Sequence, residues 1–176
     1  MSKSNVTDKS LLQKLLEAKG YEKLETKNDK FYSIYMQIDT EAECICIVSA
    51  SEGAMFFKEF IISTDMLDAL MAIVHVGGEV KELDESKGSR MAKTLVENEG
   101  YKLVYRYSKQ KSEKINVTNE GLVRAIEDDG VISIIQVRYV NGILADISEL
   151  NISYEDMIAV CERLKKEVEK MTNKEE

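Results

Sequence analysis

The sequence contains no proline and no tryptophan, and only one of its 176 residues is histidine. Because proline forms the commonest rigid linkers, two parts of this chain must be joined by glycine, serine or charged residues. The segment KELDESKGSR, residues 81–90, has that composition and is predicted to be a boundary. Any Ser-His-Asp or Cys-His catalytic set would have to use His75, whose position near a helix end is typical of a structural, dipole-facing residue.

Long apolar runs are also absent. The longest stretch without a charged residue runs from Ala69 to Gly78, whereas a membrane-spanning helix needs roughly 18 apolar residues. The first ten residues, MSKSNVTDKS, lack the apolar run of a signal peptide. We therefore expect a soluble, cytoplasmic protein with no membrane partner.

The chain has only three cysteines, and this small, odd number favours a reducing compartment over a disulfide scaffold. Cys44 and Cys46, in ECICIV, point to one face of a strand and lie roughly 7 Å apart. Zinc needs three or four ligands, so this pair would require Cys161 and a carboxylate to complete a site. So apolar a strand instead predicts buried, reduced thiols, and we expect no metal or other cofactor.

Acidic residues outnumber basic ones by 32 to 24, and the net charge of −8 repels phosphate backbones on average. The glycine stretches HVGGEV and DDGVIS lack the spacing of phosphate-binding loops. No nucleophile, base and acid can be assembled into a set. The sequence therefore indicates a non-enzymatic protein, with an enzyme of an unrecognised type as one alternative.

A repeat organises the chain. LLEAKGYEKL begins at Leu15, and the similar LVENEGYKLV begins eighty positions later, at Leu95. In the first copy Leu11, Leu12, Leu15 and Leu16 have helical spacing, which predicts one apolar face. The offset then becomes ninety, as if the second copy had about ten extra residues around SKQKSEKINV, so EFIIS at 59–63 aligns with ELNIS at 149–153.

Between two helices, each copy has three apolar stretches with strand character. They cover residues 31–38, 44–50 and 55–62 in the first copy, and 122–127, 132–140 and 143–150 in the second. We predict an α+β fold, a tandem duplication of an α-β-β-β-α unit with a mainly antiparallel sheet and helices packed on it. The predicted units cover 1–80 and 91–171, with a linker at 81–90 and a frayed tail at 172–176.

The alternation of helices with three-stranded meanders, the acidic character and the final amphipathic helix resemble type III secretion chaperones and YbjN-like proteins. The resemblance covers most of the chain and implies a chaperone-like role. It carries over no functional residue, because no diagnostic motif accompanies the pattern. The extra helix predicted at residues 89–100 departs from the usual chaperone order.

Arginines and tyrosines gather in the predicted strands of the second copy. They are Arg106, Arg124, Arg138, Tyr105, Tyr107 and Tyr139, and the alignment places Ile34 and Val48 at the positions of Arg124 and Arg138. A sheet face that mixes these types holds single-stranded nucleic acid or an acidic ligand through phosphate contacts and stacking. Because neighbouring strand residues point to opposite faces, ion pairs with the abundant carboxylates are the competing interpretation.

The last helix carries an apolar stripe whose later part, with Leu164, Val168 and Met171, is predicted to meet a partner helix. We therefore predict a protein-binding module that acts as an adaptor, regulator or chaperone-like protein. We expect its partner to be another protein, and a second copy of this chain, forming a homodimer, is one alternative. The alternative is a single-stranded nucleic-acid or anionic-ligand binding protein that uses the arginines and tyrosines.

Overall fold

The computed structural model describes residues 11–26, 32–51 and 59–173. The first half consists of α1 (Leu11–Ala18), β1 (Glu22–Lys23), β2 (Tyr32–Asp39), β3 (Cys44–Ser51), β4 (Glu59–Ser63) and α2 (Thr64–Ile73). The second half consists of η1 (Glu85–Lys87), α3 (Arg90–Glu99), β5 (Lys102–Ser112), β6 (Ile115–Ile126), η2 (Glu127–Asp129), β7 (Val131–Val140), β8 (Ile143–Ser153) and α4 (Tyr154–Thr172).

The strands form two antiparallel sheets with the same order, β1-β2-β3-β4 and β5-β6-β7-β8. Each sheet follows one helix and precedes another, which confirms the predicted α+β duplication. Each sheet has a fourth strand in addition to the three of the predicted α-β-β-β-α unit, and in the second sheet this is β5, which contains Tyr105, Arg106 and Tyr107. The reason is local: β1 has only two residues, and most of β5 is exposed and polar, so neither shows the apolar signal of a buried strand.

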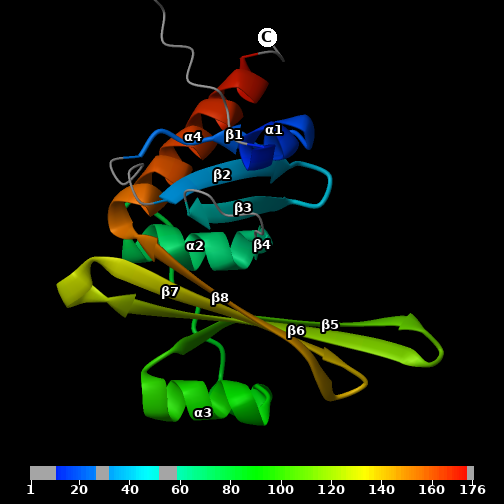
Figure 1. The fold of residues 1–176 in the computed structure, drawn as a ribbon. Helices are drawn as coiled ribbons and strands as arrows, with labels where there is room; N and C mark the ends of the chain where they lie inside the picture. Colours follow the sequence, from blue (N-terminus) through cyan, green and yellow to red (C-terminus); the bar gives the residue numbers. More distant parts are fainter. Residues whose placement is uncertain (1–10, 27–31, 52–58, 174–176) are drawn as a thin grey trace, which may run out of the picture.

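The elements stack in five layers (Figure 1), namely α1, the first sheet, α2 with the start of α4, the second sheet, and α3. The central layer holds the largest core cluster, in which Met66 of α2 and Met157 of α4 pack against Ile34 of the first sheet and Ile134 of the second. The two units therefore share a core across their inner faces, which neither sheet could bury alone.

One glycine permits this close packing. A Cβ atom on Gly121, in the middle of β6, would lie 2.6 Å from the sulfur of Met66. Real Cβ atoms are almost never that close to another heavy atom, so the absence of a side chain lets α2 approach the second sheet.

The outer faces carry the remaining helices. Leu16 of α1 packs on Tyr35 and Val48 of the first sheet, and Ala92 of α3 packs on Leu122 of the second. Both faces of the central strands are thus covered, which explains their continuous apolar runs. The apolar residues of α1 are covered unequally, because only one side of this outermost helix meets the sheet: Leu16 is buried, whereas Leu11 is 70% and Leu15 51% exposed.

Strand register refines the internal alignment. Glu22 pairs with Met36 and Lys102 with Val123, so the offset between the units is 80 at the first strand and 87 at the second. The offset is 90 at the last strand, where Glu59 and Glu149 are equivalent. The second unit therefore has seven extra residues between its first two strands and three between its last two.

This register corrects two of the predicted equivalences. At an offset of 87, Arg124 corresponds to Gln37 and Arg138 to Ser51, not to Ile34 and Val48. The sequence alignment placed all the extra residues around the β5–β6 hairpin, and this shifted β6 and β7 by three positions. Only the strand pairing reveals the second, shorter insertion.

A polar contact repeats at the corrected register. The Tyr21 hydroxyl donates to Glu59 in the first unit, with Cys46 beside it. In the second unit the Tyr101 and Ser133 hydroxyls lie 2.8 Å apart, and Ser133 donates to Glu149 at 3.3 Å. The tyrosine and the glutamate are the same in both units, and Ser133 of the second unit replaces Cys46 of the first.

The predicted linker packs against the second unit. The Leu83 backbone N–H donates to the Leu103 carbonyl at 2.8 Å, and the Leu83 side chain joins the core beneath α3. At the other end, α4 continues to Thr172, and residues 174–176 of the predicted tail lie outside the described residues. None of the helices in the described part of the chain has the length and apolar character needed to span a membrane.

Candidate functional site

The structure places the predicted arginines and tyrosines on both faces of the second sheet. Arg106, Arg124 and Tyr139 lie on the outer face with α3 and Tyr101. Tyr105 and Arg138 instead line a cavity of about 390 Å³ with Met66, on the inner side, and alternation puts Tyr107 on that side too. The six residues do not form one surface.

Two of these arginines are held by carboxylates. Arg106 Nε lies 3.3 Å from Glu120, and Arg124 Nη1 lies 3.7 Å from the Glu99 carboxylate. Arg124 also stacks over the Tyr101 ring, 4.8 Å from its centroid. Arg138 is exposed and has no ion-pair partner among the residues that the structure describes.

A groove lies between α3 and the outer face of the second sheet, with a volume of about 870 Å³. Its apolar walls are Met91 and Leu95 of α3, Leu144 and Ile147 of β8, and Tyr139 of β7. We call it the α3 groove. Its remaining lining residues are Ser89, Arg90, Thr94, Arg106, Thr118, Glu120 and Gly142.

The far wall of the α3 groove comes from strand ends that extend beyond α3 (Figure 1). Leu144 and Ile147 are 45% and 46% exposed there. Leu144 pairs with Tyr139 across β7 and β8, next to a register irregularity between Arg138 and Tyr139. Such irregularities increase local twist and redirect side chains, so this end of the sheet presents apolar groups to the groove.

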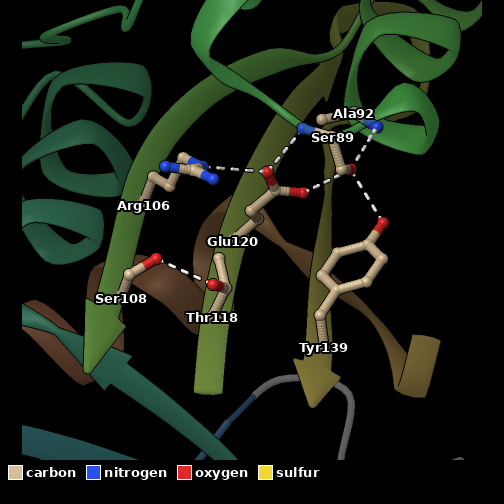
Figure 2. Close-up of polar contacts among 7 residues, drawn as sticks. All are labelled: Ser89, Ala92, Arg106, Ser108, Thr118, Glu120 and Tyr139. Atoms are coloured by element: carbon tan, nitrogen blue, oxygen red, sulfur yellow. Dashed lines mark hydrogen bonds and ion pairs between the residues drawn. The ribbon is translucent and has the colours of Figure 1, made fainter. Parts of the chain in front are cut away.

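A buried glutamate forms the floor (Figure 2). The Glu120 carboxylate accepts hydrogen bonds from the Ser89 backbone N–H at 2.7 Å, the Ser89 hydroxyl at 2.6 Å and Arg106 Nε at 3.3 Å. None of its side chain is exposed. A buried carboxylate is tolerated only when charge-assisted hydrogen bonds replace its water, and both oxygens of Glu120 have such partners.

Ser89 joins this floor to the helix above it. Its side chain caps α3 by accepting from the Ala92 N–H at 3.1 Å, and it accepts from the Tyr139 hydroxyl at 2.7 Å. The network therefore ties the start of α3 to β6 and β7 (Figure 2). It fixes the spacing between helix and sheet, and so the width of the groove.

This arrangement orients groups and does not activate a nucleophile. The single Ser89 proton goes to Glu120, and two donors occupy its lone pairs. With both lone pairs occupied, the Ser89 oxygen has none free to attack a substrate. The only histidine, His75, follows α2 and lines another cavity, of about 610 Å³, with Arg124 and Tyr154. The groove has the features of a binding site.

The predicted partner surface on α4 is divided. Leu164 packs against the central core, whereas Val168 is 60% exposed. The side chain of Met171 lies outside the described residues. The apolar stripe of this helix therefore serves the core at least as far as Leu164.

All three cysteines are free thiols. Burial raises the pKa of the Cys46 thiol to about 12, and the Glu59 carboxylate adds to this effect. Burial likewise raises the pKa of Cys44 and of Cys161, so none is a ready thiolate near neutral pH. Within residues 11–26, 32–51 and 59–173, no group of three or more His, Cys, Asp or Glu side chains is arranged to hold a metal.

The α3 groove was not predicted from the sequence, although two of its residues left a signal. Glu120 is a charged residue in the middle of a central strand, directly before the small and apolar run from Gly121 to Val123, and Ser89 stands directly before a helical pattern. A charged residue in a covered strand implies a buried partner. Leu144 and Ile147 gave no such signal, because apolar residues in a strand are most simply assigned to the core.

Comparison with known proteins gave no match to any protein-family model, curated protein or solved structure. The likeness to type III secretion chaperones and YbjN-like proteins stays a prediction. The geometry of the α3 groove is the observation on which a functional proposal can be built.

Proposed function

We propose that this protein is a non-enzymatic protein-binding module, an adaptor, regulator or chaperone-like protein that holds a segment of another protein in the α3 groove. The groove volume of about 870 Å³ is that of typical ligand sites, which are concave and mostly apolar with a few placed polar groups. The single observation that supports the proposal most strongly is this apolar groove on a floor whose buried charge is already satisfied.

The groove is preorganised for binding. The Ser89–Glu120 contacts hold α3 in place, so a ligand does not have to order the helix when it binds. Leu144 and Ile147 are about half exposed in the free protein, and covering them removes apolar surface from water. Both features favour association with an apolar segment.

Binding of single-stranded nucleic acid is the alternative raised by the arginines and tyrosines. A stacking platform needs these groups along one face. Here they are divided between two faces, and Arg106 and Arg124 already contact carboxylates. The groove is therefore the better-supported site. For location, the three free thiols favour a reducing compartment, and we propose the cytoplasm.

A displayed random-peptide library provides the experiment. Peptides are selected on the wild-type protein and then measured on Leu144→Glu, which places a charge in the groove wall. Leu15→Glu is the matched control, because Leu15 is a leucine of similar exposure, 51% against 45%, on α1. Circular dichroism and thermal unfolding establish that both variants are folded.

We expect recovered peptides to bind the wild type and Leu15→Glu equally and to lose at least about tenfold in affinity on Leu144→Glu, since a charge in an apolar contact is poorly solvated. Recovery of no peptide, or equal binding to both variants, would contradict the proposed function.

A further inference from the structure

We infer that the α3 groove selects an acidic segment, in which apolar side chains fill the groove and Asp or Glu side chains pair with Arg90 and Arg106. This inference rests on the proposed function and specifies its ligand. The inference follows from which charged side chains of the groove already have a partner and which do not.

The groove lining carries a local excess of positive charge. Two arginines and one glutamate line it, so its net charge is one positive, whereas the whole chain has a net charge of −8. Glu120 is fully buried beneath Ser89 and Arg106, so it is shielded from a ligand. The charges that an entering segment meets are those of the arginines.

Arg90 is the first residue of α3, is exposed, and has no ion-pair partner in the described part of the chain. Its charge is unusual in this acidic protein, where a nearby carboxylate would be easy to supply. An exposed arginine at a groove edge offers several N–H donors in a planar fork that matches a carboxylate.

Arg106 has N–H donors that its contact with Glu120 does not use. Its Nε contacts Glu120, and its two Nη groups donate to no other described residue. The side chain is 39% exposed and lines the groove. Glu120 thus holds this guanidinium in position while leaving its outer edge for a ligand carboxylate.

The negative charge of the rest of the molecule does not cancel this local preference. At physiological ionic strength, exposed charges are screened over about 8 Å, so groups in contact with the ligand dominate. Charge complementarity of this kind sets specificity more than affinity. The groove should therefore discriminate between peptides of equal apolar content.

The peptide selection described above gives the experiment, with Arg90→Gln added as a second target. Arg138→Gln is the matched control, since Arg138 is also exposed and unpaired among the described residues but lies on the opposite face of the same sheet. Arg106 is left intact, because its removal would deprive buried Glu120 of a partner.

We expect peptides recovered on the wild type and on Arg138→Gln to be enriched in both Asp or Glu and apolar residues, with a weaker acidic bias on Arg90→Gln. A recovered acidic peptide should bind Arg90→Gln about two- to fivefold more weakly, as for an exposed ion pair. Its Asp→Asn, Glu→Gln version should show no such difference between wild type and Arg90→Gln.

Recovery of apolar peptides without an acidic bias overturns this inference and leaves the proposed function intact, whereas recovery of no peptide overturns both. A second copy of this chain is the other candidate occupant of the groove, and sedimentation of the protein alone tests it. A concentration-dependent dimer that Leu144→Glu abolishes and Leu15→Glu preserves would assign the groove to a second copy, and so overturn the acidic-segment inference.

Discussion

The outer faces of the two units have the same architecture and different surfaces. In each, a helix that is followed by a glycine of positive φ, Gly20 or Gly100, packs on a four-stranded sheet. In the first unit Leu11 and Leu15, on the helix itself, are exposed, and so is Ile61 of β4. In the second unit the equivalent Met91 and Leu95 face a groove whose other wall is the lengthened β7–β8 hairpin.

This difference traces the α3 groove to residues that the first unit lacks. The seven and three extra residues of the second unit fall in its two hairpins, which supply Arg106, Tyr139 and Leu144. At the floor, buried Glu120 stands where the first unit has half-buried Ser33. Longer strands gave the groove its wall, and one buried charge fixed the helix above it.

The largest expected effect comes from removing that charge. Glu120→Ala leaves the Ser89 N–H, the Ser89 hydroxyl and Arg106 without their acceptor, so it should lower the free energy of unfolding by about 2–4 kcal/mol. Ser33→Ala, at the equivalent position, should cost less than about 1 kcal/mol. Urea denaturation measures both, and equal losses would mean that Glu120 does not hold the second unit's outer layer.

Next comes the inner face, where the units also differ at one equivalent position, Gly121 against Ile34. Gly121→Val should destabilise the protein by about 1–3 kcal/mol, because the added atoms meet Met66. Ile34→Val only removes a methylene and should cost about 0.5–1.5 kcal/mol. The double variant Gly121→Val, Met66→Ala shows whether Met66 is the cause: with the bulk removed, the valine should cost less than in the single variant.

The third prediction concerns pH and the equivalent residues Cys46 and Ser133. The pKa of Cys46 is raised to about 12 in the folded protein from an ordinary thiol value near 9, so the unfolded chain loses this proton first as pH rises. Stability should therefore decrease between these two values, by at most about 1.4 kcal/mol per pH unit from this group.

Cys46→Ser gives the first unit the hydroxyl of the second and removes this titration. Its stability loss between about pH 8 and about pH 10 should be smaller than that of the wild type. Urea denaturation at the two pH values provides the comparison, and parallel losses in the two proteins would show that Cys46 does not contribute.

The smallest expected effect is that of Arg106, Arg124 and Arg138 on nucleic-acid binding. Because they lie on two faces, we expect no retardation of single-stranded oligonucleotides by the wild type at ~50 mM salt, where electrostatic attraction is weakly screened. Micromolar binding that is lost when all three become glutamine would favour the nucleic-acid alternative instead.

The sequence predicted the architecture better than it predicted the site. Periodicity and the Gly-Tyr repeat predicted the duplicated α+β units, because apolar residues such as Leu16 and Ile34 in the first unit, and Leu122 and Ile134 in the second, must be buried wherever the sheets are placed. It misplaced the insertions, since an apolar strand shifted by three residues still looks like a strand. It missed the groove because Ser89, Glu120 and Leu144 come from three separate segments, and only tertiary packing brings them together.

The central claim is that ligand binding belongs to the outer face of the second unit and not to that of the first. The most direct measurement is an NMR titration of the isotope-labelled protein with a peptide recovered by selection, which follows amide and methyl shifts. The account predicts perturbations at Ser89, Leu95, Leu144 and Ile147, and none at the equivalent helix residue Leu15. Perturbations confined to α1 and the first sheet would contradict it.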